Sequence, residues 1–370
     1  DAIAAYYKAL NFKPDYAEVF INIGNSLKYQ NKISEAISAY TKALTIKPDY
    51  ADAKYNMGLF YWLIEDFIPA FDLMQWRWNA TKQPIGAQFK SDKPTWSGEY
   101  QHKIFTWKEQ GLGDEIMFSS TFFELTGRSE KLTVECDKRL IPIYKRSFPN
   151  SIDFVCDRNA VNMTDYDSHI AIGSLPKYFR RELNDFSKTS NGWLKADYQK
   201  TRSLSRRLKT SDTKKIIGLS WFTKSLQSLS RYRNVPIDLL TKHLAQIPAK
   251  YINLQYGVTV DELEALNLTS QIELLNINDI DLYGDIDGLA ALLSTCDIVI
   301  SIDNVTVHLA GALGIDTRVL LPLKADERWG LSRRDSYWYD NLTLYRQETH
   351  GDWVKPLKDL SRDLVRITQK

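Results

Sequence analysis

One stretch limits the fold more than any other: an uninterrupted apolar strand that runs directly into a helix. Residues 296–300 form a short β-branched run, which predicts a strand buried on both faces, as in a parallel sheet. Leu309, Ala312 and Leu313 then recur at helical spacing, and Gly314 is suited to end the helix. The segment therefore predicts one strand–helix unit of an α/β protein.

Polar residues lie between this strand and this helix, namely Asp303, Asn304 and Thr306. Ligands of open α/β sheets bind at the carboxyl ends of the strands, and a helix N-terminus offers unpaired N–H groups to an anion. The same residue types also serve as ordinary helix caps. The segment taken alone leaves both interpretations open.

The first eighty residues carry an internal repeat with a period of 34. Residues 13–17 recur at 47–51, and the small residue Gly24 recurs as Gly58. A period of 34 built from helix pairs is the signature of the tetratricopeptide (TPR) repeat. We expect an all-α TPR solenoid over residues 1–80, with a concave surface suited to a peptide or protein partner. A rigid spacer or an oligomerisation element is the alternative.

Two series of strands and helices follow a predicted linker, which covers residues 81–100 and contains scattered proline and glycine. Alternating strands and helices predict parallel sheets, here a first half over residues 101–205 and a second over 206–350. A C-terminal helix over 351–370 is expected to pack back on this core. The expected strands are residues 102–107, 131–136, 152–156, 169–172, 215–221, 251–256, 272–275, 296–300 and, as the final strand, 318–322.

A turn with two glycines follows the first of these strands. Gly111 and Gly113 let the backbone bend tightly, and Asp114 and Glu115 then fall in the first turn of a helix. An acid in that position is a favourable partner for the helix dipole; alternatively, it is a general base that takes a proton from an attacking hydroxyl. The dinucleotide pattern with three glycines is absent, which argues against an NAD-linked enzyme.

The first strand of the second half is followed by a polar loop that contains three cations, Lys224, Arg231 and Arg233. Cations in such a loop can neutralise a diphosphate. Solvated surface charge is the alternative for each of them.

Composition excludes several classes of protein. An apolar content of 44%, a charged content of 25% and a net charge of +2 over 370 residues indicate a globular chain without the basic field of a nucleic-acid-binding protein. Cys136, Cys156 and Cys296 are widely spaced, so we expect buried thiols in a reducing, cytoplasmic compartment. No apolar run approaches the length of a membrane span. Because the chain begins inside a repeat, we expect it to be part of a longer protein.

Several motifs together resemble the family-9 glycosyltransferases, the ADP-heptose transferases, and especially bacterial proteins that fuse TPR repeats to such a domain. The resemblance implies a GT-B fold, in which two Rossmann-like domains face one another across a cleft. It covers residues 1–355 and rests on residues 109–114, 218–221, 254–257, 303–314, 328–329, 335–339, 345–347 and 351–353.

The resemblance also implies roles for individual residues. Asp114 matches the catalytic base on the acceptor side, and Asp303 matches the acid that binds hydroxyls of the donor sugar. Asn304, Val305 and Thr306 match the element that faces the donor phosphates. The other donor-binding candidates lie in the matched motifs or in the cationic loop: Gly113, Trp221, Lys224, Arg231, Arg233, Gln255, Tyr256 and His308. The spacing of the loop does not show which of its three cations would contact the donor. For His308, a structural hydrogen bond and a ligand contact both stay open.

The expected activity is a metal-independent, inverting transfer from a nucleotide-sugar donor, with no cofactor. The TPR repeats would recruit a protein or peptide acceptor or another partner; a glycan acceptor and transient contact with a membrane surface remain alternatives. From a different class, the rival is a non-catalytic TPR scaffold with a degenerate sugar-nucleotide-binding domain.

Overall fold

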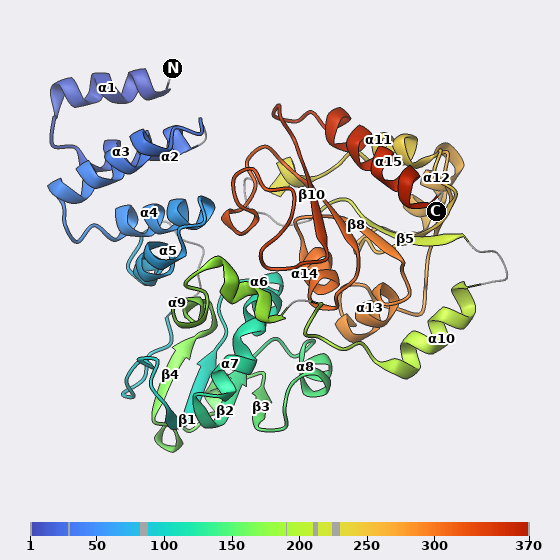
Figure 1. Cartoon of the computed structure of the whole chain (residues 1–370), viewed down its shortest axis with the longest axis horizontal. Helices are drawn as coiled ribbons and strands as arrows, with labels where there is room; N and C mark the ends of the chain where they lie inside the picture. The colour runs from blue at the N-terminus through green and yellow to red at the C-terminus, as the bar shows by residue number, and fades with distance from the viewer. Residues whose placement is uncertain are drawn as a thin grey trace. The chain divides into compact units, whose positions relative to one another are not determined.

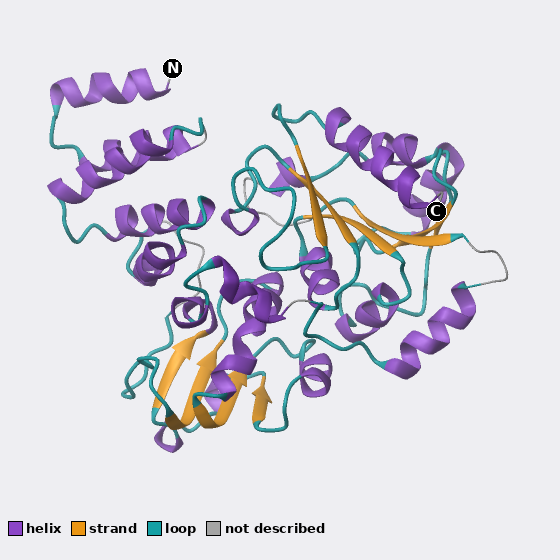
Figure 2. Cartoon of the chain, in the orientation of Figure 1, coloured by secondary structure: helices purple, strands orange, loops and turns teal. Residues whose placement is uncertain are grey.

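The computed structural model describes residues 2–28, 30–81, 88–189, 191–209, 214–223 and 230–368. These residues group into two compact units (Figure 1). Helices make up the first unit, whereas both β-sheets belong to the second (Figure 2). Unit 1 comprises Asp1–Asp92, Gly173–Asp185 and Asp326–Ser332, and unit 2 comprises Lys93–Ile172, Phe186–Ala325 and Arg333–Lys370.

Unit 1 contains the predicted helical repeats. Its helices are α1 (Ala2–Phe12), α2 (Ala17–Lys28), α3 (Ile33–Ile46), α4 (Ala51–Leu63), α5 (Phe67–Leu73), the 3-10 helix η1 (Met74–Trp78) and α9 (Pro176–Phe179). The repeated glycines allow close approach of neighbouring helices. A Cβ atom on Gly24 would lie 2.7 Å from Cε1 of Tyr40, and one on Gly58 would lie 3.0 Å from Cβ of Leu73. The period of 34 therefore reflects the packing of helix pairs.

The first α/β half of unit 2 is built on a four-stranded parallel sheet. Its strands are β1 (Gln101–Trp107), β2 (Ser129–Glu135), β3 (Ile152–Val155) and β4 (Ser168–Ala171), in the order β3-β2-β1-β4. The connecting helices include α6 (Leu112–Phe118), α7 (Phe122–Thr126) and α8 (Ile141–Ser147). All four strands were expected, and their observed bounds differ from the expected ones by at most two residues because strand ends are weakly specified by pattern alone.

The end of the predicted linker belongs to this sheet. Thr95 forms a parallel bridge to His169 of β4, and the indole of Trp96 is buried with only 1% of its surface exposed. Residues 93–100 therefore cover the sheet edge, and the linker prediction is too long at this end. Residues 82–87 lie outside the described residues.

The second α/β half is built on a six-stranded parallel sheet of order β10-β9-β8-β5-β6-β7. Its strands are β5 (Lys215–Ser220), β6 (Ala249–Asn253), β7 (Leu274–Leu275), β8 (Ile298–Ile302), β9 (Thr317–Leu321) and β10 (Leu342–Arg346). The expectation that β9 ends the series is wrong. β10 pairs with β9 at the sheet edge, and Thr343 of β10 also forms an antiparallel bridge to Asp335. The sequence of β10 follows an aromatic run that hides the strand pattern.

Helices cover both faces of the six-stranded sheet (Figure 1). Helices α11 (Ile237–Leu244), α12 (Val260–Thr269) and α15 (Val354–Thr368) lie on one face, and α13 (Ile286–Leu293) and α14 (Val305–Ala312) on the other. Helix α10 (Tyr198–Leu208) precedes the first strand of this half.

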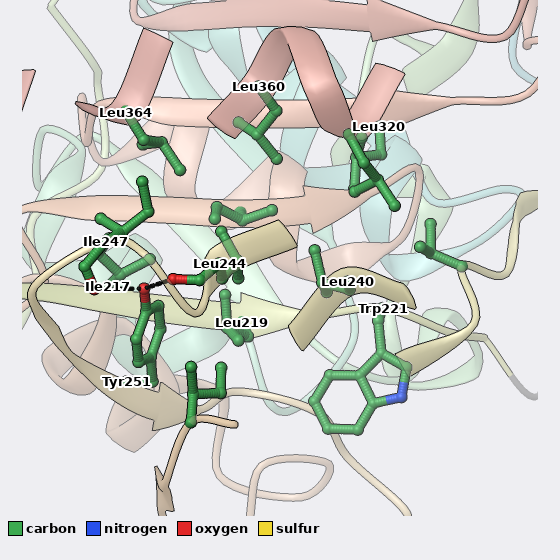
Figure 3. Close-up of a cluster of buried hydrophobic side chains, with 14 of the residues drawn as sticks. Ile217, Leu219, Trp221, Leu240, Leu244, Ile247, Tyr251, Leu320, Leu360 and Leu364 are labelled. Carbon is green, nitrogen blue, oxygen red and sulfur yellow. Dashed lines mark hydrogen bonds between the residues drawn. The ribbon is translucent and has the colours of Figure 1, made fainter. Parts of the chain in front are cut away.

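The core under α11 and α15 explains why the C-terminal helix is held in place. Leu357, Leu360 and Leu364 recur at helical spacing and are buried in one core cluster with Leu240 and Leu244 of α11. Figure 3 shows Leu360 and Leu364 with the two leucines of α11. Truncating such a leucine to alanine typically costs about 2–5 kcal/mol. Helix α15 is thus an integral part of the second half.

Two further expectations concern the cysteines and the membrane. Cys136 and Cys296 are buried, but Cys156 is exposed at the end of β3, so the expectation of a buried thiol is wrong there. Within the described part of the chain, no helix is both long and apolar enough to cross a membrane.

Candidate functional site

The carboxyl end of β8 is shaped by Asn304, which caps helix α14. Its Oδ1 accepts a hydrogen bond from the backbone N–H of Thr306 at 3.0 Å and another from the hydroxyl of Ser301 at 3.1 Å. Its Nδ2 donates to the hydroxyl of Ser220, at the end of β5, at 2.8 Å. Asn304 therefore caps its own helix and also ties two neighbouring strands together.

Gln255 extends this arrangement to a third strand end, after β6. Its side-chain Oε1 accepts hydrogen bonds from the backbone N–H groups of Trp221 and Phe222, each at 2.9 Å, and lies 3.2 Å from the hydroxyl of Ser220. Its own backbone N–H donates to Oδ1 of Asn253 at 2.9 Å. The ends of β5, β6 and β8 are thus joined by side-chain hydrogen bonds into one polar network, which we call the strand-end network (Ser220, Gln255 and Asn304).

Asp303 lies beside this network and is almost fully buried, with 4% of its side chain exposed. One carboxylate oxygen, Oδ2, lies 3.0 Å from Nη1 of Arg233, and the other, Oδ1, lies 3.9 Å from Nε2 of His308. A buried carboxylate is stable when a cation or hydrogen-bond donors face it. The structure thus brings Arg233, from the cationic loop, directly to Asp303.

The other two cations of that loop are not placed in this way. Lys224 lies outside the described residues. Arg231 lies in the 3-10 helix η7 (Ser230–Arg233), and its side chain also lies outside the described residues. Their proposed contact with a diphosphate therefore stays a prediction.

The remaining donor-side candidates occupy different environments. The ring of Trp221 is buried in the hydrophobic core (Figure 3). At the strand ends, Trp221 contributes its backbone N–H, which donates to Gln255. Tyr256 is half-buried and its hydroxyl lies 3.4 Å from Oγ1 of Thr223. Val305, the first residue of α14, is half-buried, whereas Thr306 is buried.

The first half presents Asp114 in the turn that follows β1. Its Oδ2 accepts a hydrogen bond from the backbone N–H of Gly111 at 3.1 Å, so the side chain caps its own helix α6. The residue just before this turn, Gln110, has a φ of 63°, in the left-handed region that few residues other than glycine adopt without strain. Asp114 is half-buried, and Gln110 is exposed.

A second carboxyl group lies next to Asp114 but faces the interior. Glu115 is 4% exposed, and its Oε2 accepts a hydrogen bond from the backbone N–H of Asp137 at 2.8 Å. Burial raises the pKa of Glu115 to about 7, although the Asp137 N–H and the nearby Lys108 act to lower the pKa. The two neighbouring acids thus differ in kind: one caps an accessible turn, and the other is buried behind it.

The turn of Asp114 and the helix that follows Asp303 meet inside unit 2. A Cβ atom on Gly113 would lie 2.7 Å from Cδ2 of His308, closer than real Cβ contacts. His308 is 3% exposed, and its Nδ1 lies 2.8 Å from the hydroxyl of Tyr339. Gly113 is therefore needed where the two α/β halves touch, and His308 makes the structural hydrogen bond that the sequence left open.

Some residues at this site carry no signal in the sequence pattern. Tyr339 lies in an aromatic run whose spacing gives no link to a histidine thirty-one positions earlier, and Ser220 ends an ordinary apolar strand. Glu115 is buried because it contacts Asp137 in the connection between β2 and α8. The residue spacing within helix α6 does not predict this burial. Among the described residues, no three His, Cys, Asp or Glu side chains group as a metal site requires.

The fold and this geometry define a class: a TPR-containing chain with two parallel α/β halves whose strand ends converge. Residues 24–64 match the family model of the TPR repeat, which confirms the predicted repeats. In sequence, the chain is similar to Protein FlbA of Caulobacter vibrioides, with 27% identity over 276 residues. This match covers 70% of the chain and 46% of FlbA, so the chain spans about half the length of that relative.

Among the solved structures that are similar to the chain, two have a TM-score of 0.48. One is the family-9 glycosyl transferase of Veillonella parvula, with a TM-score of 0.48 and 11% identity, covering 74% of this chain and 98% of that one. The other is the ADP-heptose lipopolysaccharide heptosyltransferase II of Escherichia coli, with a TM-score of 0.48 and 15% identity, covering 72% of this chain and 99% of that one.

Proposed function

We propose that the chain is a glycosyltransferase that moves a sugar from a nucleotide-sugar donor to a protein, peptide or glycan acceptor, without a metal ion and with inversion. The observation that carries this proposal is the contact of Gly113 with His308, which brings the turn of Asp114 next to the helix that follows Asp303. Two turns at the carboxyl ends of parallel strands, one with a candidate base and one with a helix N-terminus, supply complementary parts of a transfer reaction.

The six-stranded half supplies the donor side in this proposal. Helix α14 begins at Val305, directly after Asn304, and its N-terminal N–H groups and dipole favour a negatively charged diphosphate. Arg233 brings a positive charge to the same place. Because the leaving nucleotide diphosphate gains negative charge as the glycosidic bond breaks, groups already fixed in position lower the barrier most. Asp303 would accept hydrogen bonds from sugar hydroxyls.

The four-stranded half supplies the acceptor side. Asp114 would take the proton from the acceptor hydroxyl as that oxygen attacks the anomeric carbon, while the diphosphate leaves from the opposite face of the sugar. A single displacement of this kind inverts the anomeric configuration. The half-buried position of Asp114 at the mouth of its turn supports this role, since its carboxylate stays within reach of solvent.

The TPR repeats would bring the acceptor or a partner protein to the reaction. Helices α1, α2 and α3 line a hollow of about 270 Å³ that combines an apolar floor, formed by Phe20 and Ile23, with the charged side chains of Glu35 and Lys42. A helical solenoid with such mixed surfaces suits contact with an extended polypeptide.

Calorimetric titration with UDP-, GDP-, ADP- and CMP-linked sugars would identify the donor, and transfer assays with that donor would test the reaction. Asp114→Asn should lower the rate of transfer by about 10²–10⁴-fold and leave donor affinity unchanged, because it removes the base and keeps the cap. Asp197→Asn is the control for the loss of a capping carboxylate, since the side chain of Asp197 accepts a hydrogen bond from the backbone N–H of Lys200 at the start of helix α10. EDTA should leave the rate unchanged.

Several outcomes would refute parts of this proposal. A wild-type protein that binds none of these sugar nucleotides would remove the glycosyltransferase assignment. Binding without transfer or hydrolysis would instead support the non-catalytic scaffold. Unchanged turnover in Asp114→Asn would leave the assignment standing and remove Asp114 from the mechanism.

A further inference from the structure

Tyr339 is held rigidly against helix α14. Its ring stacks on the indole of Trp193, with ring centroids 5.4 Å apart and an interplanar angle of 11°. A Cβ atom on Gly311 would lie 2.5 Å from Cδ1 of Tyr339, so the ring packs directly on the helix backbone. With 2% of the residue exposed, its hydroxyl has a fixed position relative to α14. That hydroxyl is the group that reaches His308.

The two ring nitrogens of His308 face different partners. Nδ1 lies 2.8 Å from the hydroxyl of Tyr339, and Nε2 lies 3.9 Å from Oδ1 of Asp303. An ionised carboxylate only accepts hydrogen bonds, so it favours the tautomer that carries its proton on Nε2. In that tautomer Nδ1 is an acceptor, and the Tyr339 hydroxyl donates to it. Tyr339 thereby fixes which nitrogen presents its N–H group to Asp303.

Asp303 is consequently held from two sides. Its Oδ2 faces the guanidinium of Arg233 at 3.0 Å, while its Oδ1 faces the imidazole edge. The separation of 3.9 Å exceeds a direct hydrogen bond, so the imidazole acts on the carboxylate through its field or through a bridging hydroxyl. On its Cδ2 edge the ring abuts Gly113, which leaves it little room to rotate.

We propose that Tyr339 and His308 are positioning residues that fix the orientation of the Asp303 carboxylate toward the donor sugar. This inference rests on the proposed function, because it takes Asp303 as the group that accepts hydrogen bonds from sugar hydroxyls. A carboxylate that is free to rotate must be ordered when the sugar binds, and this ordering lowers the affinity. Neighbouring side chains that already fix its orientation remove this cost.

Tyr339→Phe tests the hydroxyl alone, because the ring and its stacking on Trp193 are retained. Tyr345→Phe is the matched control: its hydroxyl donates to Oδ2 of Asp363 at 2.8 Å, in an equally buried place between β10 and α15. We expect Tyr339→Phe to raise the donor KM about tenfold, the effect of one lost orienting hydrogen bond, without changing the acceptor KM. Tyr345→Phe should change neither constant.

Nitrogen-15 chemical shifts of the histidine side chains give a readout that needs no substrate. The chain has 5 histidines, and His308→Gln assigns the signal of interest. Wild-type His308 should carry its proton on Nε2, and Tyr339→Phe should show a mixture of tautomers. Because its amide N–H can reach the same carboxylate, His308→Gln should also retain more activity than His308→Ala.

The outcomes separate this inference from the proposed function. A wild-type His308 protonated on Nδ1, or a Tyr339→Phe variant that matches Tyr345→Phe in donor KM and tautomer, overturns the inference. A wild-type protein without donor binding overturns the proposed function, and with it the role of the pair toward a sugar. The nitrogen-15 shifts then still decide whether Tyr339 sets the tautomer of His308.

Discussion

The two α/β halves of unit 2 present their strand ends in different ways. In the six-stranded half, the strand-end network (Ser220, Gln255 and Asn304) joins β5, β6 and β8 through side-chain hydrogen bonds. In the four-stranded half, the carboxylate of Asp114 is bonded to a backbone N–H only three residues earlier. The first edge is thus joined across the sheet by side chains, whereas this bond of Asp114 lies within its own turn, which packs on His308 through Gly113.

This difference suits the two tasks that we propose. Stabilising a departing diphosphate requires dipoles and charges that are in place before the reaction, and a cross-strand network supplies that rigidity. Accepting a proton from varied acceptor hydroxyls requires a carboxylate at an accessible turn, which a local cap supplies. Substitutions in each half test whether the stability of one half depends on the other.

The largest expected effect concerns Glu115, a buried carboxyl group of the four-stranded half. Its pKa is raised to about 7 by burial, from an ordinary value of 4.5. The folded protein therefore holds a proton that the unfolded chain releases, and the stability from this group is complete below pH 4.5 and lost as pH rises through 7. The free energy of unfolding should fall by on the order of 3 kcal/mol across this window.

Chemical denaturation from about pH 5 to about pH 8 measures this fall. Glu115→Gln should remove most of it and leave the variant more stable than the wild type at the upper end. Asp197→Asn, a substitution of an accessible acid, should keep the wild-type fall. A Glu115→Gln variant with the full wild-type slope would show that this carboxyl group is already ionised when buried.

A second prediction breaks the fixed edge. Asn304→Ala removes the cap of α14 and leaves the hydroxyl of Ser220 without its donor, so the free energy of unfolding should drop by about 2 kcal/mol. Asp285→Ala is the control, because Asp285 caps α13 through the N–H of Gly288 at 2.7 Å without joining strands, and should cost about 1 kcal/mol. Urea denaturation compares the two, and equal losses would mean that the cross-strand bonds add nothing.

A third prediction tests the contact between the halves. Gly113→Ala places a methyl group against the ring of His308, which should cost about 1–2 kcal/mol and lower donor affinity. Gly111→Ser is the control: a Cβ there would lie an ordinary 3.5 Å from Asp114, and serine is a good N-cap, so stability should be unchanged or slightly higher. If both variants melt at the wild-type temperature, the contact at Gly113 is not tight.

The smallest effect concerns the strained residue before the turn of Asp114. Gln110→Gly should raise the free energy of unfolding by about 0.5 kcal/mol, because relief of the left-handed strain exceeds the entropy that glycine adds to the unfolded chain. Asn191 also has a positive φ, of 70°, but asparagine tolerates this region, so Asn191→Gly should give no gain. Thermal unfolding distinguishes the two; a destabilised Gln110→Gly would show that the glutamine side chain contributes more than the strain costs.

Local patterns were enough to predict most elements of the fold. The 34-residue period, the helix pairs of unit 1 and the parallel strands of both halves follow from residue spacing, since side chains that repeat with the element's own period share one buried face. The pattern failed at β10, where pairing with β9 decides that five residues form a strand. Trp221 belonged to a matched motif, but its ring lies in the core, because alternate residues of an extended chain share one face and Trp221 continues the row of Ile217 and Leu219.

The sequence by itself determined which residue types stand at strand ends: Asp114 at the start of one helix, and Asp303 and Asn304 at the start of another. Only the tertiary structure decided their partners, such as Arg233 for Asp303, Tyr339 for His308 and Gly113 for the histidine ring. Spacing along a chain reports contacts within one element, whereas these contacts join segments that are brought together only when both sheets have formed.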